Sequence, residues 1–453
     1  MTMSRYEQLK HLDRTYLWHP FTQMREWMGE DPIIIERGEG HYLVDVEGKR
    51  YLDGVSSLWC NVHGHRKAEL DRALREQLDR IAHSTFLGLS HVPGIELAEQ
   101  LVEIAPSGLK RVFYSDSGAT AVEVALKIAM QYWQLKGETA RTGFASLVEA
   151  YHGDTVGSMS VGYSETFHHF HRSLLFPVLR LNPPHVFRWF KRMSEETALK
   201  SAIQEAEEKL AQEKNSLAAL IAEPLMQGAA GMWSQPAVYV KALSEICRKN
   251  GILFITDEVA TGFGRTGRMF ACEQAGVTPD ILCLAKGITG GYLPLAATLT
   301  TEKIFSAFLG EYREFKTFFH GHTYTGNPLG CAVALASLEL FKQGKIIERM
   351  QPKIDYLKRR LEREFVPLPH VADIRQWGFM VGIELAEDKD SRKSYPMAKR
   401  IGHKVILDAR KRGVMIRPLG DVIILMPPLT ITENELASLV DVTYQSIKAV
   451  TEG

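Results

Sequence analysis

The chain has 453 residues, of which 45% are hydrophobic and 24% charged, and Lys+Arg and Asp+Glu are equal at 54 each. This composition is typical of a globular protein, and the balanced charge argues against a nucleic acid or a membrane surface as the partner. The first residues lack the apolar core of a signal peptide, and no apolar run approaches the ~18 residues that cross a bilayer. The five scattered cysteines lack zinc-site spacing, so we expect a cytoplasmic protein without a metal site.

Residues 33–53 alternate apolar and polar positions around glycines, which predicts a small antiparallel meander. From about residue 66, helical and strand patterns alternate, which is typical of parallel βαβ units. We therefore expect an α/β fold with a mostly parallel central sheet flanked by helices. The expected strands are residues 111–115, 144–149, 217–223, 252–256, 281–285 and 295–300, and the expected helices are 68–81, 94–104, 119–135, 195–214, 238–250 and 327–341.

The character of the sequence changes at about residue 345, where charged helices alternate with short strands. The expected helices are residues 353–364, 397–412 and 433–450, and the expected strands are 380–385, 414–418 and 422–428. This pattern predicts a smaller α+β domain that packs with the N-terminal meander. The expected division is an N-terminal segment 1–60 joining the small domain, a large domain 61–344 and a C-terminal small domain 345–453.

Lys286 follows the apolar run 281–285, which is expected to form a buried strand. Partial desolvation at the mouth of such a strand lowers the pKa of a lysine and frees its amine to form a Schiff base. Asp257 and Glu258 end another apolar run, 252–256. A lysine and a carboxylate at the carboxyl ends of two strands indicate pyridoxal phosphate, whose pyridinium nitrogen pairs with a carboxylate. The alternatives are a solvated lysine and a helix-capping acidic pair.

Residues 115–120, Ser-Asp-Ser-Gly-Ala-Thr, link an expected strand to an expected helix. Small residues before a helix N-terminus can close on a phosphate, although the same residues also serve as a plain helix cap. Tyr151 follows a strand and can stack on a flat ring, or simply belong to a turn. Glu223 has the same placement and the same two interpretations.

Three further features remain open on the residues alone. Arg265, in a glycine-bounded loop, is either a structural anchor or a substrate contact. Arg417, before a proline, is either a surface arginine or a carboxylate clamp. The histidines at 168, 169 and 171 lack the spacing of a helical metal site.

With these residues in place, nearly the whole chain resembles the class III aminotransferases, fold type I enzymes that use pyridoxal phosphate. The Asp257 and Lys286 stretches are specific to the class, while Trp59, Arg417 and residues 18–21 resemble the branch that aminates 8-amino-7-oxononanoate in biotin synthesis. The segments that carry the likeness are residues 18–22, 53–59, 63–65, 115–121, 151–155, 257–267, 284–287, 320–328 and 417–420.

The resemblance implies a role for each matching residue. Lys286 would form the Schiff base and shuttle a proton, Asp257 would hold the pyridine nitrogen protonated, and Tyr151 would stack on the ring. The implied cofactor-binding residues are Ser117, Gly118, Ala119, Tyr151, His152, Glu223, Asp257, Val259, Lys286, His322 and Thr323. The implied substrate-binding residues are Phe21, Trp59, Tyr151, Arg265, Gly321 and Arg417. Thr323 would reach the phosphate of a neighbouring subunit, which implies a homodimer with shared sites.

The resemblance implies ping-pong amino transfer from a donor to 8-amino-7-oxononanoate, giving 7,8-diaminononanoate. Members that use S-adenosylmethionine as donor have Tyr at the place of Phe21 and Pro-Thr at the place of His322-Thr323. Loss of a hydroxyl that binds a polar donor typically costs ~1–3 kcal/mol. These departures favour lysine over S-adenosylmethionine as the donor.

Other functions fit parts of the sequence. Another class III ω-aminotransferase or an aminomutase would share Lys286 and Asp257 and differ at Trp59, Phe21 and Arg417. A metal-dependent hydrolase would use Asp257 and Glu258 with the histidine cluster, and an inert binding module would not need Lys286.

Overall fold

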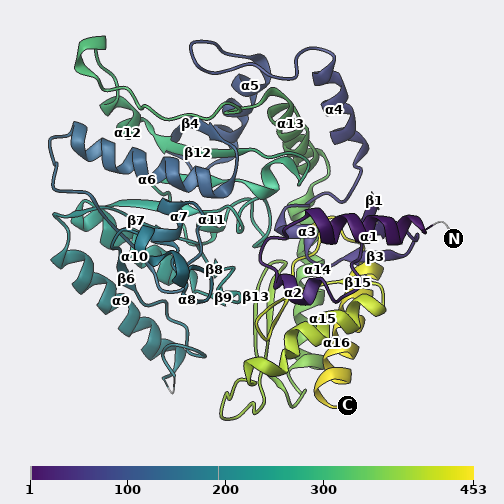
Figure 1. Ribbon diagram of the computed structural model, residues 1–453. Coiled ribbons are helices and arrows are strands. Elements are labelled where there is room, and N and C mark those ends of the chain that lie inside the picture. Colours follow the sequence, from purple (N-terminus) through teal and green to yellow (C-terminus); the bar gives the residue numbers. More distant parts are fainter. Residues whose placement is uncertain (1–2, 192) are drawn as a thin grey trace.

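A computed structural model describes residues 3–191 and 193–453. Its centre is a seven-stranded sheet in the order β4-β12-β11-β10-β7-β5-β6 (Figure 1). The strands are β4 (Leu109–Ser115), β5 (Gly143–Leu147), β6 (Leu179–Leu181), β7 (Leu217–Ala222), β10 (Leu253–Asp257), β11 (Ile281–Leu284) and β12 (Ala296–Thr301). Only β12 runs antiparallel to its neighbours β4 and β11. The expected α/β class with a mostly parallel sheet is therefore confirmed.

Helices cover both faces of this sheet because successive side chains of a buried strand point to opposite sides. Ile255, Ile281 and Cys283 pack with α6 on one face. Phe254 and Leu282 belong to the core on the other face, where α10 packs against β10. The main helices of this layer structure are α4 (Ala68–Leu78), α5 (Val92–Ile104), α6 (Gly118–Leu135), α9 (Glu195–Gln212), α10 (Ala237–Asn250) and α13 (Pro328–Gln343).

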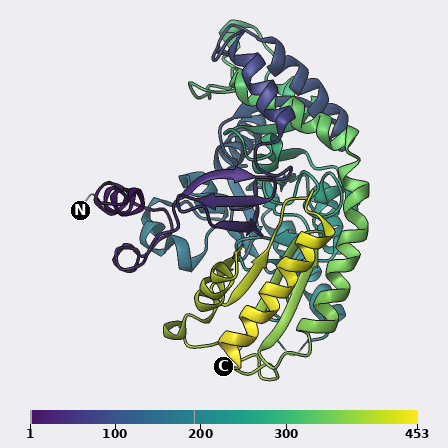
Figure 2. The same ribbon diagram turned by 90° about the vertical axis from the view of Figure 1, so that its right-hand side faces the viewer.

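Besides a two-stranded pair of β8 (Met226–Gln227) and β9 (Trp233–Ser234), two four-stranded sheets accompany the large one. The predicted meander is confirmed as β1 (Ile35–Glu39), β2 (Tyr42–Asp45) and β3 (Arg50–Asp53), which are antiparallel. Its last strand pairs in parallel with β15 (Val414–Met415), so the N-terminal strands lie beside the C-terminal segment (Figure 2). The other sheet has the order β13-β14-β17-β16. Its strands are β13 (Val371–Trp377), β14 (Met380–Leu385), β16 (Arg417–Leu419) and β17 (Val422–Leu425). We propose that the large domain spans residues 61–344 and contains the seven-stranded sheet. The small domain would then consist of residues 1–60 and 345–453, which supply the two four-stranded sheets.

The C-terminal helices are α14 (Ile346–Arg360), α15 (Ile401–Lys411) and α16 (Glu433–Thr451). The first begins seven residues earlier than expected and continues through Pro352, which lies inside the helix. The expectation started after this proline because an interior proline removes a helical hydrogen bond. Strand β13 was not expected, because its sequence Val-Ala-Asp-Ile-Arg-Gln-Trp has no clear alternation.

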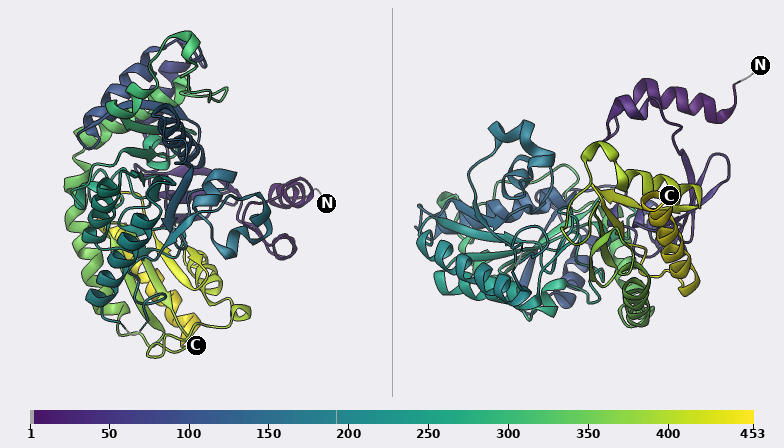
Figure 3. Two further views of the ribbon diagram at one scale, coloured as in Figure 1. Left: turned by 90° about the vertical axis from the view of Figure 1, so that its left-hand side faces the viewer. Right: turned by 90° about the horizontal axis from the view of Figure 1, so that it is seen from below.

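An N-terminal helix, α1 (Arg5–Tyr16), also escaped the sequence analysis. It has no buried residue, so it lacks the apolar stripe that reveals a packed helix. Figure 3 shows it standing away from the body of the chain. The remaining short elements are α2 (Met24–Trp27), α3 (Ser56–Trp59), α7 (Val156–Val161), α8 (Glu165–His168), α11 (Ala271–Gln274) and α12 (Glu302–Ala307). Across residues 3–191 and 193–453, no helix combines the length and apolar character that crossing a membrane requires.

Candidate active site

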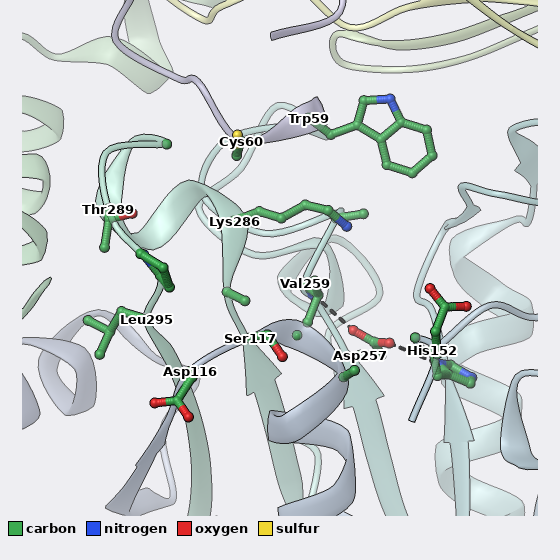
Figure 4. Close-up of a pocket in the computed structure, with 18 of the residues that line it drawn as sticks. Trp59, Cys60, Asp116, Ser117, His152, Asp257, Val259, Lys286, Thr289 and Leu295 are labelled. Carbon is green, nitrogen blue, oxygen red and sulfur yellow. Dashed lines mark hydrogen bonds and ion pairs between the residues drawn. The ribbon is translucent and has the colours of Figure 1, made fainter. Parts of the chain in front are cut away.

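A cavity of about 670 Å³ opens at the carboxyl ends of the central strands. This edge of an open α/β sheet is where ligands bind, because the loops after the parallel strands meet there. Ten of the sixteen residues proposed from the sequence line it: Trp59, Ser117, Gly118, Ala119, Tyr151, His152, Glu223, Asp257, Val259 and Lys286. Figure 4 shows the residues of this cavity that matter most for its chemistry.

Lys286 follows the buried strand β11 after one residue, Ala285, and begins a short 3-10 turn. Its φ of 44° is left-handed, a conformation that costs a non-glycine residue about 1–3 kcal/mol and is common at functional sites. Burial lowers the pKa of its ammonium group, while the charges of Asp257 and Glu223 act in the opposite direction. The amine lies 5.3 Å from the centre of the Trp59 ring. A larger fraction of free amine is therefore present than in an exposed lysine.

Asp257 ends β10, the strand next to β11. One of its oxygens accepts a hydrogen bond from the Val259 amide at 3.0 Å, and the other lies 2.7 Å from Nδ1 of His152 (Figure 4). Both side chains are buried, with 5% and 0% of their surface exposed. The imidazole and the amide hold the carboxylate in one orientation inside the cavity.

Tyr151 and Glu223 form a second polar group on the cavity wall. The Tyr151 hydroxyl donates to Asp154 Oδ2 at 2.7 Å, and burial raises its pKa. Glu223 is buried and accepts hydrogen bonds from the amides of Tyr151 and Gly228 at 3.2 and 2.9 Å. Burial raises the pKa of the Glu223 carboxyl to about 7, although these amides and His152 oppose the rise. Glu223 can therefore hold or release a proton near neutral pH.

The N-terminus of α6 forms one end of the cavity. Ser117 is the N-cap and accepts from the Thr120 amide at 3.3 Å, so the capping interpretation is confirmed. A Cβ on Gly118 would lie 2.5 Å from a methyl of Val259, and a Cβ on Gly153 would overlap Ala119. These glycines leave the amides at the helix start accessible, and the helix dipole favours an anion there.

Six of the proposed residues do not line the cavity: Phe21, Arg265, Gly321, His322, Thr323 and Arg417. Arg265 is buried, and its guanidinium donates to the carbonyls of Pro427, Trp59 and Asn61 at 2.6, 3.3 and 3.1 Å. These contacts are those of the structural anchor, the first of its two interpretations. Burial lowers the pKa of Arg265 to about 10.

The other five have different surroundings. His322 Nδ1 is 2.6 Å from Oδ2 of Asp116, which does line the cavity, whereas Gly321 and Thr323 are exposed. Phe21 is 67% exposed and makes an edge contact with Phe167, whose ring centre is 6.2 Å from that of Tyr151. Arg417 lies on β16.

The sequence analysis missed part of the lining. Cys60, Asp116 and the segment 291–295 contribute to the wall. The first two had a signal, since each is adjacent to a proposed residue or motif. The segment 291–295 had none, because it enters the wall only through the tight turn at Gly290 and Gly291, both with positive φ.

The histidine cluster has a structural position beside the cavity. His168 is buried, its ring is stacked at 12° to that of Tyr151, and its Nε2 lies 3.3 Å from Asp154. His169 and His171 are exposed. Within the described part of the chain, no group of three or more His, Cys, Asp or Glu residues is arranged to hold a metal ion.

Comparisons with known proteins point in one direction. The profile of a family described as Aminotransferase class-III matches residues 24–447. The chain is 54% identical over 451 residues to the adenosylmethionine-8-amino-7-oxononanoate aminotransferase of Nitratidesulfovibrio vulgaris, covering 99% of this chain and 83% of the relative. The solved structure of that name from Methanocaldococcus jannaschii has a TM-score of 0.93 at 47% identity, covering 98% of this chain and 99% of that one. An amine transaminase from an uncultivated Pseudomonas species, solved in a PLP-bound form, has a TM-score of 0.91 at 38% identity, covering 96% and 99%.

Proposed function

Because the chain belongs to the class III aminotransferases, we propose that it transfers an amino group to 8-amino-7-oxononanoate in biotin synthesis, with pyridoxal phosphate as its cofactor. The chain has the fold type I architecture of the solved transaminases. The names of the relatives from N. vulgaris and M. jannaschii support the substrate. The observation that carries the proposal is the placement of Lys286 and Asp257 after adjacent parallel strands in one cavity.

The cavity has residues suited to three groups of this cofactor: its phosphate, its ring nitrogen and its aldehyde. Gly118 and Ala119 at the start of α6 would hold the phosphate, and Asp257 would pair with the ring nitrogen. Lys286 would hold the aldehyde carbon through its amine. When bound, pyridoxal phosphate supplies an aldehyde that accepts the amino group and a ring that withdraws negative charge.

The residues of the chain supply the proton transfers and the orientation. Lys286, with its lowered pKa, removes and returns the proton at the substrate carbon that bears nitrogen. The carboxylate of Asp257, fixed by His152 and the Val259 amide, keeps negative charge at one end of the site. Tyr151 and Val259 would cover the two faces of the ring, and Trp59 and Arg417 would bind the keto acid, with Arg417 on its carboxylate.

For the amino donor we propose lysine, as the phenyl ring of Phe21 and the His322-Thr323 pair favour. S-adenosylmethionine is the second candidate, because adenosylmethionine is part of the names of the relatives from N. vulgaris and M. jannaschii. The two donors differ in size and polarity, so we expect only one of them to react. A half-reaction without the keto acid tests each donor alone.

Addition of lysine to the purified holoenzyme is expected to remove its visible absorbance, and 8-amino-7-oxononanoate is expected to restore it. S-adenosylmethionine at the same concentration is expected to leave the spectrum unchanged. The measurement is a stopped-flow or steady-state absorbance titration, with pyruvate in place of the keto acid as the control. Bleaching by S-adenosylmethionine alone would transfer the donor role to it, and restoration by pyruvate but not by the keto acid would favour a general ω-aminotransferase.

We also propose a homodimer in which Thr323 reaches the phosphate site of the partner subunit. Its support is the number of large apolar side chains that are exposed on one chain: Trp18 is 89% exposed, Leu87 90% and Phe319 77%. Exposed apolar side chains that form a contiguous patch mark interfaces, and the homodimer that we propose would cover such side chains. The helix α1 also has no buried residue and stands away from the body of the chain (Figure 3).

Sedimentation equilibrium is expected to give twice the mass of one chain. Replacement of Thr323 by alanine is expected to weaken cofactor retention on dialysis while the mass stays dimeric. A monomeric mass with full cofactor occupancy would contradict the shared site.

A further inference from the structure

The loop that carries Trp59 includes the short element α3, whose backbone is not that of a regular helix. Ser56, Ser57 and Trp59 have positive φ values of 52°, 59° and 66°, and Ser57 has a ψ of −79°. None of these residues is glycine, so the conformation persists only if surrounding contacts hold it. The loop joins β3 to Asn61, and it presents Trp59 to the cavity.

Asp53, the last residue of β3, supplies the first of these contacts. Its Oδ1 accepts from the Ser57 amide at 2.8 Å, and its Oδ2 accepts from the Ser57 hydroxyl at 3.0 Å. The side chain of Asp53 is only 2% exposed. A buried carboxylate needs strong partners, and the second partner of its Oδ2 is His65 Nε2 at 2.9 Å.

The hydrogen bonds around His65 determine which of its nitrogens carries the proton. The amide of Gly64 donates to Asn61 Oδ1 at 2.7 Å, so the Asn61 side-chain nitrogen is the donor toward His65 Nδ1, 3.0 Å away. Nδ1 therefore accepts, and Nε2 carries the proton that it donates to Asp53. Strand β1 packs directly against the His65 side chain, because a Cβ on Gly38 would lie 2.5 Å from His65 Cβ.

The loop places the Trp59 ring against two groups of the site. The ring centre lies 5.3 Å from the Lys286 amine, and a Cβ on Gly228 would meet the ring at 3.1 Å. Gly228 donates its amide to Glu223. A rotation of the Trp59 backbone would therefore move the ring away from the Lys286 amine and from Gly228, the residue that donates its amide to Glu223.

We propose that His65 is a positioning residue for the aminotransferase reaction: through Asp53 it holds the left-handed loop that places Trp59 over Lys286. The proposal deepens the proposed function and rests on it for its kinetic consequence. His65 does not line the cavity, so its effect on substrate passes through Trp59.

Three replacements of His65 distinguish the effect of its hydrogen bond to Asp53 from the effect of its side-chain volume. Glutamine places an amide nitrogen near the position of Nε2 and keeps the donor to Asp53, whereas asparagine reaches only the position of Nδ1. His65→Asn and His65→Ala are expected to raise the KM for the keto acid about tenfold with little change in kcat, as loss of one hydrogen bond to a buried carboxylate implies. His65→Gln is expected to stay close to the wild-type KM. Equal values for the glutamine and asparagine variants would overturn the proposal.

A double-mutant cycle tests whether the effect passes through Trp59. In a Trp59→Phe background, His65→Asn is expected to change KM by much less than it does in the wild-type background. Full additivity would show that His65 acts by another route and would overturn the proposal.

Tryptophan fluorescence tests the position of the Trp59 ring without any enzymatic turnover. The fluorescence of Trp59 is the difference between each protein and its Trp59→Phe counterpart, and acrylamide quenching of that difference reports the exposure of the ring. We expect quenching to rise in His65→Asn and not in His65→Gln. Unchanged quenching would overturn the positioning role, while absence of amino transfer in the wild type would overturn the proposed function alone.

Discussion

Replacement of Lys286 by alanine is expected to lower kcat by about 10³-fold or more, the largest loss of any single substitution in this chain. In the proposed reaction the amine both holds the cofactor and moves the substrate proton, so we expect no second residue of the cavity to replace it. Glu223 can exchange a proton near neutral pH, but a carboxyl cannot hold the aldehyde. Single-turnover measurements with each half-reaction would resolve the loss, and borohydride reduction followed by peptide mass mapping would place the label on Lys286 in the unaltered protein.

Lys353 provides a matched control. Burial lowers its pKa as well, but its amine donates to the carbonyls of Leu429 and Ile431 at 3.0 and 2.7 Å, outside the cavity. Lys353→Ala is expected to lower thermal stability and to leave kcat unchanged. A label on another lysine, or a Lys286→Ala variant with normal turnover, would contradict the proposed chemistry.

Replacement of Asp257 by asparagine is expected to lower kcat by about 10²–10³-fold with the fold intact. Asparagine has the same shape but removes the charge at the end of the cavity where we propose that the ring nitrogen binds. It also changes what His152 Nδ1 meets at 2.7 Å. Steady-state kinetics, with circular dichroism as the measure of folding, would test this expectation.

The neighbouring carboxylate, Glu258, provides a control for the loss of a buried negative charge outside the cavity. Glu258 is fully buried and accepts from the amides of Ala271 and Cys272 at 2.7 and 2.8 Å, away from the cavity. Glu258→Gln is expected to lower the thermal stability and to spare kcat, because its amide nitrogen would face an amide donor. A loss of kcat in Glu258→Gln as large as that in Asp257→Asn would contradict the assignment of the reactive carboxylate.

The sequence allowed the central sheet and part of the site to be predicted for a physical reason. Lys286 and Asp257 each follow a short apolar run, and the ends of parallel strands converge at one edge. The antiparallel direction of β12 could not be predicted, because an apolar run such as 295–300 indicates a buried strand but not whether that strand is parallel to its neighbours. The contact between Trp59 and Lys286 joins residues 227 positions apart, and no local pattern carries that information.

Side-chain partners were the least predictable part. The sequence left Arg265 with two interpretations, and its three carbonyl contacts became visible only with the loops that supply them. The pairing of His152 with Asp257, and of His322 with Asp116, likewise depends on tertiary placement.

The parallel pairing of Leu52 with Val414 and of Asp53 with Met415 has a consequence for biosynthesis. The ribosome makes β3 about 360 residues before its partner, which at roughly 5–20 residues per second is a wait of some tens of seconds. During that interval the outer edge of β3 in the meander is unpaired, and the loop that carries Trp59 follows directly after it. The part of the cavity wall that contains Trp59 is therefore among the last parts of the nascent protein to fold.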